Sequence, residues 1–161
     1  MFLANEILDM AVQFEKNGEA VYRSAVSRVS DPTLAALLAW MADEESRHAD
    51  GFARLKRKVA GGRDPFSREL SRELLGEMIG EQRFSLGEVD FSAIEHQDHL
   101  IRIFIEFEKD TIIFYEMLTP FIEDAETRAS LETIIDEENH HIDRLRVFLE
   151  HEEPLPADAD A

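Results

Sequence analysis

Apolar residues recur at alternating spacings of three and four along four stretches of the chain, the pattern of an amphipathic α-helix. The stretches run from about residue 5 to 29, 32 to 60, 93 to 119 and 124 to 151. Asn5 and Asp31 are good N-cap residues, Pro32 suits a first helical turn, and Gly61 follows the second stretch. We therefore predict an all-α protein built on four long helices.

The second pair of stretches repeats the first pair. Glu138 follows Glu45 by 93 residues, and the same offset relates the inward positions of both pairs. Matched positions include Leu8 with Ile101, Glu15 with Glu108, Tyr22 with Tyr115, and His48 with His141. A duplicated helical hairpin predicts a four-helix bundle with a pseudo-two-fold internal repeat.

The connector between the two pairs spans residues 63–92. Its apolar residues from Leu70 to Ile79 have helical spacing, interrupted by Gly76, so we predict a short helix laid across the bundle. A connector this long can cross the bundle, which would make the second and third long helices parallel. We assign residues 1–151 to one domain and predict that the acidic, proline-containing tail, 152–161, is disordered.

Six ionisable residues stand at inward positions of these otherwise apolar stripes. They are Glu15, Glu45, His48, Glu108, Glu138 and His141. Burying isolated carboxylates costs several kcal/mol each, and the inward stripes contain no lysine or arginine to offset their charge. Two divalent metal ions would supply four positive charges for the four carboxylates. The alternative is a metal-free bundle whose glutamates and histidines form protonated or solvated networks.

The spacing within each repeat suits metal binding, because a Glu-x-x-His pair places both side chains on one helix face, one turn apart. We expect Glu45 and Glu138 to bridge two metals, and Glu15 and Glu108 to bind one metal each. Each histidine would bind one metal. Carboxylate and imidazole ligands favour iron, with manganese or zinc as substitutes, and favour redox chemistry over a structural zinc site.

Several other polar or aromatic residues fall near the six in this pattern. Tyr22 and Tyr115 lie two turns from Glu15 and Glu108, and each either hydrogen-bonds a ligand carboxylate or has its hydroxyl satisfied elsewhere. The remaining candidates are predicted to lie beside the site or on the surface: Glu44, Glu137 and His140, which are off the inward stripes, and His96 and His99, near a helix start. For Trp40 we predict a packing role alone.

Composition narrows the classes of partner. The formal net charge of -18 disfavours nucleic acid, whose binding depends on basic side chains. The longest apolar run, Leu34 to Ala42, is far shorter than a membrane span, and the N-terminus lacks a signal-peptide pattern. The absence of cysteine excludes disulfides and thiolate metal sites. We expect a cytoplasmic protein without a membrane or nucleic-acid partner.

Together these motifs resemble the ferritin-like superfamily, and within it the rubrerythrins. The resemblance rests on Glu15 with Tyr22, Glu108 with Tyr115, and the Glu-x-x-His pairs that begin at Glu45 and Glu138. It implies a non-haem di-iron site that oxidises Fe(II), reduces hydrogen peroxide or reacts with dioxygen, and it suggests a homodimer.

The chain departs from the rubrerythrin pattern in two ways. Rubrerythrins typically place another glutamate where this chain has Thr111, and many carry a cysteine-ligated rubredoxin domain. An external electron-donor protein would therefore be needed. Two other functions stay open at this point: an iron-sequestering protein without turnover, and a helical module that docks a partner protein.

Overall fold

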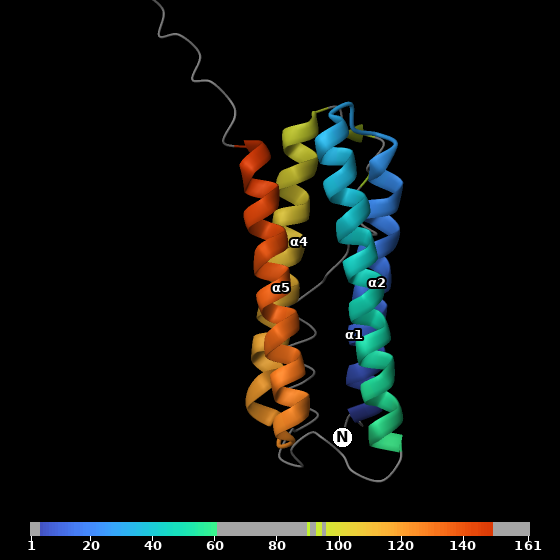
Figure 1. Ribbon diagram of the computed structural model, residues 1–161, viewed down its shortest axis with the longest axis vertical. Helices are drawn as coiled ribbons and strands as arrows, with labels where there is room; N and C mark the ends of the chain where they lie inside the picture. Colours follow the sequence, from blue (N-terminus) through green and yellow to red (C-terminus); the bar gives the residue numbers. More distant parts are fainter. Residues whose placement is uncertain (1–3, 61–89, 91–92, 95, 150–161) are drawn as a thin grey trace, which may run out of the picture.

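The computed structural model describes residues 4–60, 90, 93–94 and 96–149 (Figure 1). Its four long helices are α1 (Ala4–Val26), α2 (Pro32–Ala60), α4 (Gln97–Leu118) and α5 (Ala125–Leu149). A short 3₁₀ turn, η3 (Thr119–Phe121), follows α4, and the described residues contain no strand. The prediction of an all-α, four-helix protein is confirmed.

Aspartates fix the starts of two helices. The Thr33 backbone N–H donates to Asp31 Oδ1 at 2.8 Å, and the Thr127 backbone N–H donates to Asp124 Oδ2 at 2.8 Å. Such caps satisfy amide groups that the helix itself leaves unpaired. The predicted cap of the first helix is wrong, because α1 already begins at Ala4 and Asn5 lies within it.

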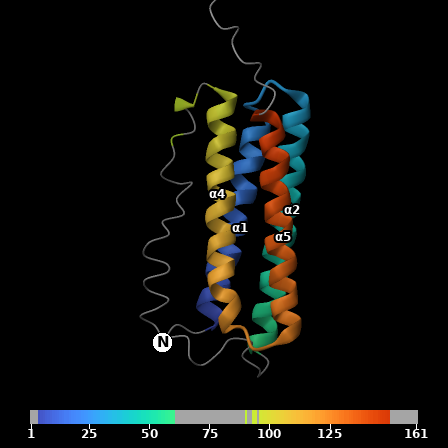
Figure 2. The same ribbon diagram turned by 90° about the vertical axis from the view of Figure 1, so that its left-hand side faces the viewer.

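The helices form two antiparallel hairpins that pack against each other (Figures 1 and 2). Helices α1 and α2 form one hairpin, and α4 and α5 form the other. Helices α2 and α4 run in the same direction, as the predicted long crossover requires. The predicted crossover helix and the predicted disordered tail lie outside the described residues. None of the described helices has the length and apolar character needed to cross a membrane.

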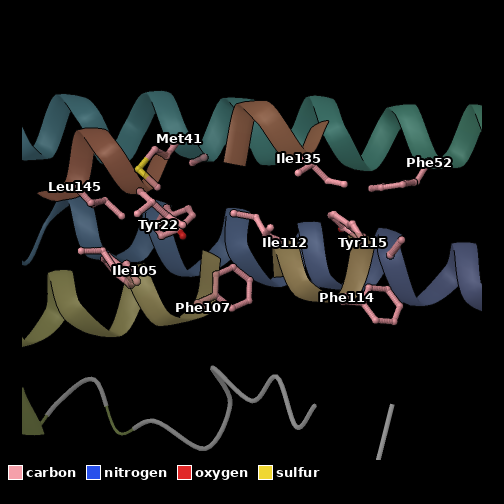
Figure 3. Packing of buried hydrophobic residues seen from close by; sticks show 14 of the residues in the cluster. Tyr22, Met41, Phe52, Ile105, Phe107, Ile112, Phe114, Tyr115, Ile135 and Leu145 are labelled. Carbon is pink, nitrogen blue, oxygen red and sulfur yellow. The ribbon is translucent and has the colours of Figure 1, made fainter. Parts of the chain in front are cut away.

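The bundle interior consists of apolar side chains on both sides of a polar middle. Along α2 the buried side chains at the predicted inward positions are Leu34, Leu38, Met41, Glu45, His48 and Phe52. Figure 3 shows part of the apolar packing, with the Tyr115 ring 5.2 Å from that of Phe52. On α5 the buried residue is Ile135 rather than the predicted Ile134, which is half-buried. The bundle therefore holds its polar residues between two apolar layers.

Candidate metal centre

The polar middle of the bundle is formed by the six residues that the sequence pattern singled out. Glu15 lies on α1 and Glu108 on α4, while α2 and α5 each contribute a Glu-x-x-His pair. All six side chains are at most 1% exposed. Each pair lies on one face because residues three apart on a helix are neighbours.

The six residues form two overlapping groups in which ligand atoms lie within 4.8 Å of one another. One group contains Glu15, Glu45, His48 and Glu138, and the other contains Glu45, Glu108, Glu138 and His141. Glu45 and Glu138 belong to both groups. This arrangement has the form of two adjacent cation sites with two shared carboxylates.

Both histidines present Nδ1 to the carboxylates. His48 Nδ1 lies 2.9 Å from Glu138 Oε1, and His141 Nδ1 lies 2.8 Å from Glu138 Oε2. The two rings are nearly parallel, with centroids 6.1 Å apart. Glu138 therefore lies between the two histidines, one oxygen facing each ring.

Two tyrosines connect the halves of the repeat. Tyr22 on α1 donates its hydroxyl to Glu108 on α4, and Tyr115 on α4 donates to Glu15 on α1. Burial, followed by the nearby glutamate charges, raises the pKa of each tyrosine well above its usual value, so both stay protonated donors. Of the two predicted alternatives, the structure has the carboxylate hydrogen bond, made across the pseudo-two-fold axis.

Many polar atoms at this centre form no well-aligned hydrogen bond, although several lie close to one another. They are Glu15 Oε2, Glu45 Oε1, His48 Nδ1, Glu108 Oε2, both carboxylate oxygens of Glu138, and both ring nitrogens of His141. Leaving buried polar atoms unpaired is costly. Oxygen and imidazole donors that converge in this way fit a divalent transition-metal ion, whose coordination would satisfy most of these atoms.

The pKa shifts at the metal-free centre also indicate a site suited to a cation. Burial, reinforced by repulsion from Glu138 and Glu15, raises the pKa of Glu45 well above its usual range. Burial would lower the pKa of His48 and His141, but close contacts with neighbouring glutamates outweigh it and raise the pKa of both to about 10. Burial likewise opposes ionisation of Glu138, but its contacts with the two histidines lower its pKa. Without metal, the centre therefore retains protons that a cation could replace.

A residue just outside the centre makes a direct contact with His48 that the sequence did not predict. His48 Nε2 donates to Glu137 Oε2 at 2.8 Å, and Arg47 pairs with Glu137 at 2.9 Å and with Glu44 at 2.6 Å. Hydrogen bonds of this kind fix the ring of a metal-binding histidine. Glu137, which was predicted to lie beside the site or on the surface, thus contacts His48 directly. In contrast, His96, His99 and His140 are exposed.

Two residues near the centre were not recognised from the sequence. A Cβ atom on Gly18 would lie 2.6 Å from Glu45 Oε2, so any larger residue there would displace that carboxylate. Its signal was a glycine one turn after Glu15, at an inward position. Trp40, for which only packing was predicted, meets His141 edge-on with ring centroids 5.3 Å apart. No sequence signal identified that contact, because it joins two helices.

A four-helix bundle that buries one glutamate on each of two helices and a Glu-x-x-His pair on each of the others defines the ferritin-like class of carboxylate proteins. The rubrerythrin family model matches residues 6–149, and the chain belongs to the rubrerythrin family. The predicted family resemblance is confirmed.

A solved structure supports the fold independently. The chain is similar to a Thermotoga maritima protein whose crystal structure is described as that of a candidate ferritin-like diiron-carboxylate protein, with a TM-score of 0.66. The two share 20% sequence identity over 94% of this chain and 97% of the other, a likeness that shows the fold alone. No curated protein matches the chain.

Proposed function

We propose that this protein is a non-haem di-iron oxidoreductase of the rubrerythrin type, which reduces hydrogen peroxide or reacts with dioxygen and can oxidise Fe(II). The observation that carries the proposal is the convergence of four buried carboxylates and two imidazoles whose inward atoms form no well-aligned hydrogen bonds. Membership of the rubrerythrin family and the likeness to a diiron-carboxylate protein support iron as the metal.

The two overlapping groups suggest an assignment of ligands. Glu45 and Glu138, which belong to both groups, would bridge two iron ions. Glu15 and His48 would complete one site, and Glu108 and His141 the other. Two divalent ions would balance the four carboxylate charges, which would otherwise repel one another in a dry interior.

A pair of ferrous ions held by these six residues would supply the two electrons needed to reduce a peroxide, with two protons, to water. The surrounding residues hold the ligands in place for that change of charge. Tyr22 and Tyr115 donate to Glu108 and Glu15 from the opposite half of the repeat. Glu137 holds the His48 ring from its outer side. Such preorganisation limits the reorganisation that the reaction requires.

The electrons would come from an external donor protein, because the chain contains no cysteine with which to bind its own rubredoxin-type iron. The localisation we propose is cytoplasmic.

One observation favours a second candidate, an iron-sequestering protein without turnover. Thr111 stands where rubrerythrins typically have another glutamate, and its hydroxyl donates to the Phe107 carbonyl oxygen at 3.0 Å. The centre then lacks the additional carboxylate that iron movement during peroxide reduction would use. Storage chemistry would need only the six ligands already described.

Iron binding and turnover test these proposals in turn. Protein loaded anaerobically with Fe(II) should hold about two iron ions per chain. Glu138→Gln should lose most of this iron, whereas Glu132→Gln, on the exposed face of the same helix, should keep it. Repeated peroxide consumption with an added electron donor supports the oxidoreductase, and a single round of oxidation supports sequestration. A wild-type protein that takes up no Fe(II) would contradict both.

A further inference from the structure

A cavity of about 480 Å³ lies along the seam between α2 and α5 and reaches His48. Its apolar walls include Ile7, Leu8, Phe52, Leu55, Leu131 and Ile134. Two ion pairs cross the seam, Arg47 with Glu137 and Lys58 with Glu126, each at 2.9 Å. Arg47 and Lys58 are about 16 Å apart along α2, at about 1.5 Å per residue. The two ion pairs therefore mark the two ends of an opening, here called the window, beside the metal centre.

The pseudo-two-fold repeat provides an internal comparison, because the centre is closed off at the other end of the same seam. There Arg144 on α5 lies over the Trp40 ring from α2, 4.5 Å from its centroid, and Trp40 in turn packs against His141. A second hollow at this end, of about 410 Å³, is lined by Trp40 and Arg144 but by none of the six centre residues. His141 is thus covered where His48 borders a cavity.

Small residues replace large ones at the open end. At the repeat offset of 93 residues, Gly51 matches Arg144, and Thr133 matches Trp40. A Cβ atom on Gly51 would meet nothing closer than Arg54 Nη2, at 3.9 Å, so the space in front of Gly51 is open. The asymmetry between the two ends therefore comes from the residues at these paired positions.

The cavity has charged residues at both ends and is largely apolar along its walls. His48, Glu137 and Arg47 stand at the end beside the metal centre, and the Lys58–Glu126 pair stands at the other end. Phe52 and Leu55 are among the apolar walls between them. Its volume lies within the range of about 300–1,000 Å³ typical of sites for small organic ligands. Hydrogen peroxide is far smaller and polar, so it gains nothing from apolar walls, and dioxygen, although apolar, is too small to fill a cavity of this volume. The lining instead complements a molecule with a polar end and an apolar carbon body.

We propose that this cavity binds an organic hydroperoxide with an apolar body and directs its O–O group toward the His48 side of the centre. This inference rests on the proposed peroxide chemistry. In that reaction the O–O bond breaks, two electrons come from the two ferrous ions, and two protons complete an alcohol and a water molecule. Gly51 and Thr133 then act as specificity-determining residues, because their small side chains keep the cavity open.

The first test uses metal-free protein and cumyl alcohol, the product of cumene hydroperoxide, as a non-reactive probe. Nuclear magnetic resonance titration should show saturable shifts at Phe52 and Leu55. Gly51→Leu should abolish them by filling the window, with Thr133→Trp as a second blocking variant. Ala36→Leu, in the hollow at the closed end, should leave them unchanged. Absence of binding, or binding that both blocking variants retain, would overturn the proposal.

The second test compares two peroxides in iron-loaded protein. Gly51→Leu should slow the reduction of cumene hydroperoxide by about tenfold or more, since pocket contacts control specificity on this scale. Reduction of hydrogen peroxide should change much less, because that molecule does not need the apolar walls. Equal slowing of both substrates would contradict a role in specificity. A wild-type protein that binds the probe but reduces neither peroxide would instead count against the proposed function.

Discussion

Gly18 offers a sharp test of how tightly the centre is packed. Replacing it with alanine would place a Cβ atom 2.6 Å from Glu45 Oε2 and 3.1 Å from Phe107 Cε1. To reach an ordinary contact of 3.4 Å, the Glu45 oxygen would have to move from 2.6 Å, a displacement of about 0.8 Å. Glu45 is one of the two proposed bridging ligands, so a shift of this size would alter both metal sites.

The expected effect on stability is small, whereas the effect on iron binding is large. Alanine improves helix propensity by about 1 kcal/mol over glycine, while overpacking a buried site costs about 1–3 kcal/mol. In metal-free protein the free Glu45 side chain can move aside, so the two terms nearly cancel. With iron bound Glu45 would be fixed, and we expect iron affinity to fall about 10- to 100-fold, as for other perturbations beside a metal site.

Gly51→Ala provides a matched control, since it is also a glycine within a long helix. Its Cβ would meet only Arg54 Nη2 at 3.9 Å. This variant should gain about 1 kcal/mol in unfolding free energy and keep wild-type iron binding. Urea unfolding of metal-free protein and anaerobic Fe(II) titration measure the two quantities. Gly18→Ala with unchanged iron affinity would refute the packing argument.

Three further predictions concern the residues around the centre. Tyr22→Phe removes the donor to Glu108 in a dry interior and should cost about 1–3 kcal/mol in unfolding free energy, measured by urea denaturation; an unchanged midpoint would contradict it. Metal-free protein should lose stability as pH rises from about 6.5 to about 10, seen as a falling Tm, because folding raises the pKa of His48 and His141 to about 10. Their stabilisation is complete below the unfolded-state pKa of about 6.5 and is lost through the folded value, so a Tm that rises over this range would refute the assignment. Glu137→Gln weakens the hold on the His48 ring and should lower iron affinity by about tenfold in Fe(II) titration, whereas Glu132→Gln should not change it.

Some features of the centre could be predicted because they are local. Glu-x-x-His on a helix brings two ligands to one face, whatever the rest of the chain does. The repeat then showed that glutamates at otherwise apolar positions occur on all four predicted helices, which required a common interior. The outward placement of His96 and His99 followed from the same pattern, and both are exposed.

Other features depended on contacts that periodicity does not encode. The pattern left open which partner each tyrosine has, and the tyrosines proved to cross between the halves. The Arg47–Glu137 pair and the packing of Trp40 on His141 join α2 to α5, whose relative register the sequence does not specify. The one-residue shift from Ile134 to Ile135 has the same origin, since helix rotation depends on packing against neighbours.

The sequence by itself determined four helices, their duplication, and six buried ionisable residues whose charges must be balanced, because helical period and the cost of buried charge act within each segment. Only the tertiary structure decided how the two halves differ. It brought Gly51 and Thr133 together in the lining of one cavity. At the other end of the seam it packed Trp40 against His141 and placed Arg144 over the Trp40 ring. The physical reason is that a cavity is formed by side chains from several helices, so its shape depends on how those helices pack.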